Sequence, residues 1–247
     1  MTNYEKFHQL HHQSTPLILA NVWNVKSAQI AEKSGFAAIA TSSGAIAESL
    51  GYRDGEQIPF AELLYIIQRI NATTSIPLSV DLERGYSDDP AILNDNIQKL
   101  IDSGVAGINL EDAQGEEIYL KKLNHIKNYL VKTNQQLFIN ARTDAFLQKL
   151  PAPLKTTLIR AELYREAGAD GLFVPGVQEA ETIKEITSYT TLPVNVVGVP
   201  KIASIAELTD YGVKRISMAV LLYKATYRHM EKLAQEIMDK QSFEALS

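Results

Sequence analysis

Four junctions of the same kind constrain what this chain of 247 residues can fold into. At each junction a helix-like segment ends at a glycine, and an apolar, strand-like segment begins directly after it. Glycine is the residue expected just past the C-terminus of a helix. Repeated turns of this kind indicate βαβ units and a parallel sheet. The junctions are Ser34-Gly35-Phe36, Ser103-Gly104-Val105, Ala167-Gly168-Ala169 and Tyr211-Gly212-Val213.

The rest of the chain completes eight such units. After a leading helix from Tyr4 to His12, we predict strands near 16–22, 36–41, 77–83, 107–112, 137–143, 171–177, 193–198 and 215–219. Helical sequence follows each strand, near 26–34, 60–73, 90–102, 117–132, 153–167, 179–188, 201–210 and 221–240. This alternation favours an α/β fold of the (β/α)₈ TIM barrel type, with residues 1–247 in a single domain. An open doubly wound sheet is the alternative, but its dinucleotide-binding form requires a Gly-x-Gly-x-x-Gly that is absent here.

Composition excludes several classes of protein. A formal net charge of −5 and the lack of a basic run argue against a nucleic-acid partner. The absence of cysteine removes disulfides, thiolate metal sites and a cysteine nucleophile. The polar N-terminus does not resemble a signal peptide, and no apolar run approaches the ~20 residues that span a bilayer. We therefore expect a cytoplasmic enzyme without a membrane partner.

The third predicted strand has an unusual acidic face. Asp81 and Glu83 alternate with aliphatic residues, which places both carboxylates on the same side of the strand. Buried carboxylates are costly unless something pairs with them. The next strand likewise ends in acids, at Glu111 and Asp112. Adjacent strands that bring acids to one end predict a site for Mg²⁺, or Mn²⁺, bound largely through water by Asp81, Glu83 and Glu111.

Other polar residues follow the predicted strands, where a barrel of this type builds its active site. Arg142 lies beside the acidic strands, which suits an anionic substrate held between a metal and a guanidinium. The segment Ser42-Ser43-Gly44 could hold a carboxylate through backbone N–H groups at a helix start, or could be a plain turn and cap. Structural interpretations remain open for the acids: an ion-pair network for Asp81 and Glu83, and a helix cap for Asp112.

Seven short motifs together resemble one family. In chain order they are Ala20-Asn-Val22, Thr41-Ser-Ser-Gly44, Gly51-Tyr-Arg-Asp54, Val80-Asp-Leu-Glu-Arg-Gly-Tyr86, Asn109-Leu-Glu-Asp112, Ala141-Arg-Thr-Asp-Ala145 and Pro193-Val-Asn195. Their order and their positions at strand ends resemble the isocitrate lyase / phosphoenolpyruvate mutase superfamily, over roughly residues 16–220. The resemblance implies a (β/α)₈ barrel, a Mg²⁺ ion and a substrate with an α-keto-acid or enolpyruvate core.

The resemblance also implies roles for individual residues. The substrate carboxylate would contact Ser42, Ser43 and Gly44, and Asn195 matches an asparagine of the lyase branch. The metal would lie among Asp81, Glu83 and Glu111. The remaining assignments concern catalysis, in which Arg142 binds and polarises the substrate, and Glu111 and Asp54 lie beside the metal or substrate. Asp54 by itself reads as a turn residue.

The chain departs from the family in its lid. The lyases have a cysteine-bearing lid after the fourth strand, where this chain has the shorter Asp112-Ala-Gln-Gly-Glu-Glu-Ile118. Lys121, Lys122 and Asn124 resemble the lysine and asparagine of mutase lids in type, but their pattern is helical. Pro175 and Gly176 stand where mutases have a histidine. The chain is therefore similar to a short-lidded, phosphonomutase-like member.

These observations support three hypotheses. The first is a lyase that cleaves a C–C bond of a small α-keto or 2-hydroxy dicarboxylic acid through a pyruvate enolate. The second is a mutase or hydrolase of the phosphoenolpyruvate/phosphonopyruvate type, and the third is a catalytically silent barrel that binds a keto acid. We also expect a homo-oligomer, a dimer or tetramer, because residues 221–240 have an apolar stripe that one barrel would leave uncovered. The resemblance adds that this last helix is exchanged between subunits.

Overall fold

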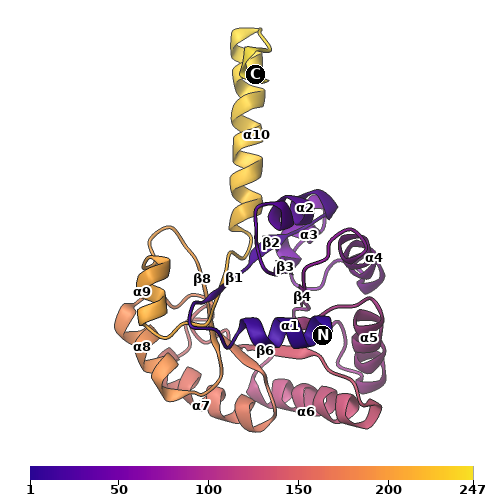
Figure 1. Ribbon diagram of the computed structural model, residues 1–247, viewed down its shortest axis with the longest axis vertical. Coiled ribbons are helices and arrows are strands. Elements are labelled where there is room, and N and C mark those ends of the chain that lie inside the picture. The colour runs from indigo at the N-terminus through magenta and orange to yellow at the C-terminus, as the bar shows by residue number, and fades with distance from the viewer. Residues whose placement is uncertain (247) are drawn as a thin grey trace.

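The computed structural model describes residues 1–246 as a ring of parallel strands surrounded by helices (Figure 1). The sheet order is β1-β9-β8-β7-β6-β5-β4-β3-β2, and every neighbouring pair is parallel. The strands are β1 (Leu17–Ile18), β2 (Ala20–Val22), β3 (Ile39–Thr41), β4 (Leu78–Asp81), β5 (Gly107–Glu111), β6 (Phe138–Arg142), β7 (Gly171–Phe173), β8 (Val194–Val197) and β9 (Arg215–Ser217).

The ring closes through the first predicted strand. Only Leu19 separates β1 from β2, and its backbone N–H donates to the Ile216 carbonyl at 2.9 Å. On one side of this break β1 pairs with β9, and on the other β2 pairs with β3. The predicted (β/α)₈ barrel is thereby confirmed, and the alternative of an open sheet is wrong.

The helices follow the predicted order, with two differences. They are α1 (Asn3–Leu10), α2 (Val25–Lys33), α3 (Ser43–Ser49), α4 (Phe60–Asn71), α5 (Pro90–Asp102), α6 (Glu116–Thr133), α7 (Pro153–Glu166), α8 (Ala180–Tyr189), α9 (Ile205–Asp210) and α10 (Leu221–Lys240), before a 3₁₀ turn, η1 (Glu244–Leu246). The short α3 is absent from the predicted helices, although one interpretation of Ser42-Ser43-Gly44 placed a helix start there. α9 begins later than predicted because Ser204 and Glu207 form a capping box there. The glycines of the four junctions all have φ between +81° and +89°.

Helix α1 covers the N-terminal end of the barrel. Its Phe7 is fully buried in a small apolar cluster with Leu19, Ala106 and Phe138, which belong to the first strand and to the starts of later ones. Figure 1 shows α1 lying across this end of the ring. The opposite end, where the strands reach their C-termini, is therefore the end available for a site. Within residues 1–246, no helix combines the length and apolar character needed to cross a membrane.

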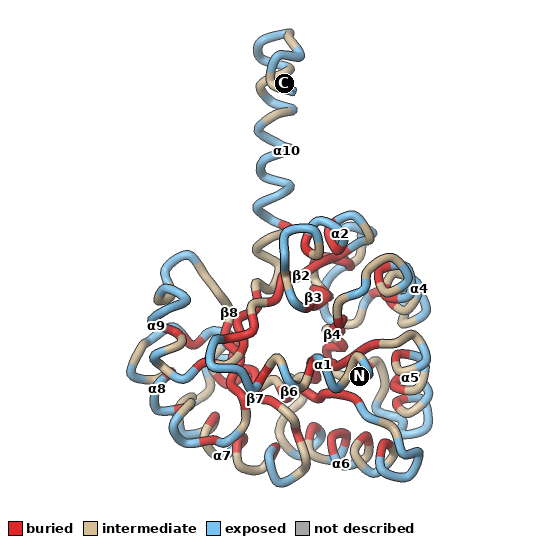
Figure 2. Tube along the Cα trace, in the orientation of Figure 1, coloured by how far each residue is buried: buried red, intermediate tan, exposed pale blue. Residues whose placement is uncertain are grey.

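Between this cluster and the C-terminal end, the buried barrel interior contains a polar layer. The Asn140 amide donates to Asn109 at 2.9 Å and to Asn195 at 3.2 Å. Arg215, which is fully buried, donates to the same Asn109 oxygen at 3.1 Å. Figure 2 shows that most of the ring of strands is coloured as buried. This layer fixes the strand carrying Asn109 directly beneath the C-terminal end of the barrel.

Candidate active site

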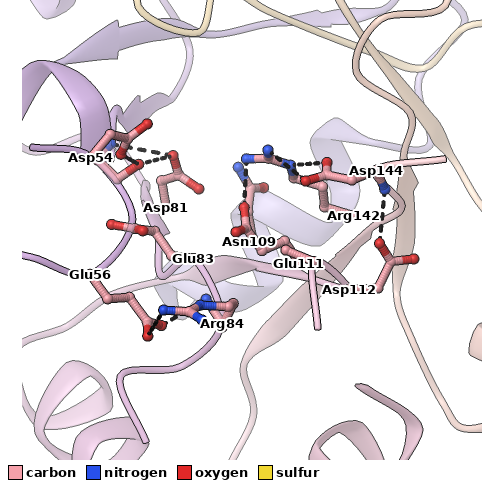
Figure 3. Close-up of polar contacts among 12 residues, drawn as sticks. Asp54, Glu56, Asp81, Glu83, Arg84, Asn109, Glu111, Asp112, Arg142 and Asp144 are labelled. Atoms are coloured by element: carbon pink, nitrogen blue, oxygen red, sulfur yellow. Dashed lines mark hydrogen bonds and ion pairs between the residues drawn. The ribbon is translucent and has the colours of Figure 1, made fainter. Parts of the chain in front are cut away.

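A cavity of about 370 Å³ lies at the C-terminal end of the barrel. Six residues predicted from the sequence line it: Ser42, Ser43, Gly44, Asp54, Asp81 and Arg142. They come from the start of α3 directly after β3, from the ends of β4 and β6, and from the loop after α3. In Figure 3, Asp81 and Arg142 lie on either side of Asn109, which agrees with the position of β5 between β4 and β6. The sequence motifs, far apart along the chain, therefore meet in one place.

The acidic wall of the cavity is organised around Ser43. Its hydroxyl lies 2.9 Å from Asp81 Oδ2 and 3.2 Å from Asp54 Oδ1, and its backbone N–H donates to Asp81 at 3.3 Å. A Cβ on Gly44 would lie 3.1 Å from Asp54 Oδ2, so glycine leaves room for that carboxylate. Asp54 is thus part of the site, and it also lies in a turn, as its local sequence predicted.

The neighbouring Glu83 is a buried acid with an unusual backbone. It follows β4 with a φ of +51° and is only 4% exposed. Burial raises the pKa of Glu83 to about 8, and the nearby carboxylate of Asp81 adds to the rise. The Tyr86 hydroxyl donates to Glu83 at 3.3 Å. Within residues 1–246, Glu83 forms no ion pair.

Arg142 supplies the positive charge of the cavity. Its guanidinium contacts Glu111 at 2.8 Å and Asp144 at 2.7 Å, as Figure 3 shows. Burial alone would lower the pKa of Arg142, but the Glu111, Asp81 and Asp144 carboxylates hold it above its usual range. Burial also raises the pKa of Glu111 to about 7, although Arg142 opposes this rise. The arginine is therefore charged and held in one orientation.

Asp112 supports this arrangement from behind. It is buried and accepts hydrogen bonds from Arg160 Nη1 at 2.7 Å, the Tyr164 hydroxyl at 2.6 Å and the Asp144 backbone N–H at 2.9 Å. The proposed helix-cap role of Asp112 is wrong, because α6 begins after Gly115. Asp112 instead fixes Asp144, which in turn holds Arg142. Arg160 and Tyr164 were not predicted from the sequence, because the pattern of a helix does not show which loop the helix residues contact.

The acids of the site fit a hard cation that keeps part of its water. Within residues 1–246, no three histidine, aspartate or glutamate side chains are grouped closely enough to hold a metal directly. Asp81 is the acid that faces the cavity from β4, and its buried Oδ1 has no hydrogen-bond partner. Glu83 and Glu111 lie behind it rather than in the cavity lining. This donor set suits Mg²⁺, which commonly binds through one or two carboxylates and retained water.

Asn195 lies outside the cavity. It is fully buried in the polar layer below, where its amide donates to the Val196 carbonyl at 2.7 Å and to Ser217 Oγ at 3.1 Å. Its oxygen accepts from Asn140. With its hydrogen-bonding groups engaged in this layer, Asn195 supports the floor of the site, and its contact with substrate stays a prediction.

The connection that would form a lid is short. Only residues 112–115 join β5 to α6. Lys121, Lys122 and Asn124 all lie on α6, as their helical pattern predicted. Lys121 is exposed and pairs with Glu117, whereas Lys122 is buried and donates to the Arg84 carbonyl at 2.8 Å. Lys122 therefore fastens the loop after β4 rather than serving in a lid.

Comparison with known proteins agrees with this geometry. Residues 7–238 match the phosphoenolpyruvate phosphomutase family. The chain belongs to this family. It is 35% identical to an uncharacterized protein of Mycobacterium tuberculosis, covering 94% of this chain and 89% of that one. It is 26% identical to the 2-methylisocitrate lyase of Escherichia coli, covering 91% and 79% of the two chains.

Comparison with solved structures supports the same family assignment. A Burkholderia cenocepacia protein with a provisional phosphonomutase description superimposes with a TM-score of 0.88 and 36% identity, covering 94% of this chain and 99% of that one. The predicted membership of the isocitrate lyase / phosphoenolpyruvate mutase superfamily is confirmed, and with it the prediction of an enzyme class that includes lyases and mutases.

Proposed function

We propose that the protein is a Mg²⁺-dependent lyase that cleaves a C–C bond of a small α-keto or 2-hydroxy acid through a pyruvate-type enolate. Mn²⁺ would serve in place of Mg²⁺, and this class of acids includes the dicarboxylic acids of the first hypothesis. The observation that carries the proposal is that Asp81 and Arg142, from separate strands, both line one cavity. An acid that would hold the cation and a guanidinium that would contact the substrate oxygens bring two positive charges to the place where an enolate develops.

The chain's own residues account for binding. Ser43 and Gly44 line the cavity beside Asp81, and we place the substrate carboxylate against them. Because the Ser43 N–H now donates to Asp81, this binding requires that hydrogen bond to be exchanged. Arg142 is held by Glu111 and Asp144, so it can meet the substrate's carbonyl oxygen without reorientation. A bound Mg²⁺ would add positive charge beside the same oxygen.

The reaction that fits this geometry is a retro-aldol or decarboxylation step. The C3–C4 bond of the keto acid breaks, its electrons form the C2–C3 double bond of the enolate, and the C2 carbonyl pair moves to oxygen. C4 leaves as a carbonyl group when its hydroxyl loses a proton, or as CO₂ when C4 is a carboxylate. Negative charge then develops on the C2 oxygen, where the Arg142 guanidinium stabilises it. Protonation at C3 completes the keto-acid product. Arg142 therefore acts most strongly in the transition state, which is the condition for accelerating the chemical step.

Oxalate tests this proposal because it resembles a pyruvate enolate in shape and charge. We expect calorimetry to detect oxalate binding that requires Mg²⁺. Arg142→Ala should weaken it by at least ~30-fold, since loss of a charge-assisted contact to a buried anion costs ~2–5 kcal/mol. Lys121→Ala is the control, because Lys121 is exposed on α6. Absence of oxalate binding with Mg²⁺ present would overturn the enolate mechanism.

Product analysis separates this function from its alternatives. A lyase releases a keto acid, whereas phosphonate hydrolysis releases phosphate. A silent keto-acid-binding barrel would bind oxalate and release neither product from any acid tested. A larger effect of Lys121→Ala than of Arg142→Ala would indicate that a mutase-like lysine acts in the site.

A further inference from the structure

The cavity has two halves of different chemistry. The polar half contains Asp54, Asp81, Arg142 and the serines after β3. The other half comes from the loop after β6, from the ends of β7 and β8, and from the start of α10. Its side chains are mainly apolar, and these are Leu147, Phe173, Pro175, Val197, Val199 and Leu221.

Positive charge is confined to the polar half. Of the described residues that line the cavity, Arg142 is the only lysine, arginine or histidine, and it already contacts Glu111 and Asp144. On the apolar side, Gln178 contributes a neutral amide. A carboxylate placed against this wall would lose its water without gaining a charged partner, which is unfavourable. An alkyl group placed there would instead leave water for an apolar surface.

The apolar wall is built into the fold. Phe173 is the last residue of β7, is buried, and lies with its ring centroid 5.9 Å from the Arg142 guanidinium carbon. Leu147 lies in the loop after β6, and half of its surface (50%) is exposed to solvent. Its Cδ2 would lie 3.1 Å from a Cβ on Gly176, so these two loops pack closely. A ligand chain in the cavity would therefore meet a fixed phenyl ring and a leucine that still has apolar surface to bury.

We propose that the far end of the substrate, beyond its carboxylate, its C2 carbonyl and the carbon that leaves as a carbonyl group, is an uncharged aliphatic group that binds this apolar wall. This inference rests on the proposed function and narrows it. Among small α-keto and 2-hydroxy acids, it selects those with an alkyl chain over those with a second carboxylate at the far end. The polar end lies at Asp81 and Arg142, and the alkyl end lies at Phe173 and Leu147.

A matched series of 2-oxo acids tests the inference by calorimetry with Mg²⁺ present. From 2-oxobutanoate to 2-oxopentanoate to 2-oxohexanoate, we expect about fourfold tighter binding per methylene, the change that burial of one CH₂ group gives. 2-Oxoglutarate has the chain length of 2-oxopentanoate but ends in a carboxylate. It should bind at least ~10-fold more weakly, because that carboxylate is desolvated without a partner.

Two variants make the test specific to the apolar wall. Leu147→Ala should reduce the gain per methylene and leave oxalate affinity unchanged, because Leu147 lies outside the polar half. Val199→Lys places a cation in the wall and should shift the preference toward 2-oxoglutarate. The inference is overturned if wild-type protein binds oxalate but binds 2-oxoglutarate as tightly as 2-oxopentanoate. If oxalate also fails to bind, the proposed function itself falls, and this inference falls with it.

Discussion

Asp81 is the residue on which the proposed cation site depends. It reaches the cavity from β4, and one of its carboxylate oxygens is buried without a partner. We expect Asp81→Asn to weaken Mg²⁺ binding by at least ~10-fold, since a neutral amide replaces the anionic ligand while retaining its shape. Titration calorimetry on both proteins measures this, with the exposed Glu231→Gln as control. Equal Mg²⁺ affinity in wild type and Asp81→Asn would refute the assignment.

Glu83 makes stability depend on pH when no divalent cation is present. Its pKa is raised to about 8 by burial and by Asp81, against ~4.3 for a glutamate in an unfolded chain. Between these values the folded state retains a proton that the unfolded state has lost. The free energy of unfolding should therefore fall as pH rises from about 4.5 to about 8.

Thermal unfolding in EDTA at several pH values measures this effect. Glu83→Gln should flatten the fall, because a glutamine has no proton to lose. Saturating Mg²⁺ should also offset the fall, since the cation stabilises the charged carboxylates. Identical pH profiles for wild type and Glu83→Gln would show that other groups govern the dependence.

At the scale of single residues, the sequence predicts those site residues that periodicity or strand-end position identifies. Alternation along one strand identified Asp81 and Glu83, and strand-end position identified Arg142. The contact of Ser43 with Asp54 and the contacts of Asp112 with Arg160 and Tyr164 join separate loops and helices. No local pattern specifies such partners, because they depend on how whole elements pack.

Helix α6 shows how an element outside the barrel holds the site. Its Lys122 ammonium donates to the Arg84 carbonyl at 2.8 Å and to Gln114 at 3.0 Å, and it contacts Asp88 at 2.6 Å. Arg84 follows Glu83 directly and also pairs with Glu56 at 2.9 Å. The segment after β4 is therefore fastened from both sides, and the position of Glu83 depends on both contacts.

Neighbouring lysines on α6 provide a matched comparison. Lys122→Ala should lower the free energy of unfolding by about 1–3 kcal/mol, because it leaves the partly buried Arg84 and Gln114 acceptors without their donor. Lys121→Ala should change it by less than about 0.5 kcal/mol, since its partner Glu117 is exposed and surface pairs contribute little. Urea denaturation measures both values. Equal losses in the two variants would contradict the assigned role of Lys122.

The positions of helices and strands were predictable where characteristic residues, such as glycine, stand at their ends. The four glycine junctions located helix ends, because the residue just past each helix has a left-handed backbone conformation, which glycine adopts most easily. The short α3 was missed because its seven residues provide too few turns for a helical period to show. The first strand was predicted as one continuous strand. In the closed barrel it is interrupted at Leu19, so that the part before Leu19 pairs with β9 and the part after it pairs with β3.

On the scale of the whole molecule, one barrel leaves most of α10 uncovered. Figure 1 shows this helix projecting away from the ring of strands. Its base packs on the barrel, where the Tyr223 and Trp23 rings meet edge to face at 5.2 Å. Farther along, Met230 is 63% exposed and Met238 is 66% exposed. A groove of about 420 Å³ runs between α2 and the base of α10, and its lining is mainly apolar.

We therefore expect a homo-oligomer in which a second copy covers α10 and this groove. The double substitution Met230→Glu and Ile237→Glu places charge on the apolar stripe and should yield monomers, because burying unpaired carboxylates disfavours association. Lys232→Glu is the control, since helical spacing places it on the opposite side of α10. Light scattering at micromolar concentration should give a dimer or tetramer for wild type and Lys232→Glu. A monomeric wild-type protein would mean that α10 stands free in solution and that its stripe serves another partner.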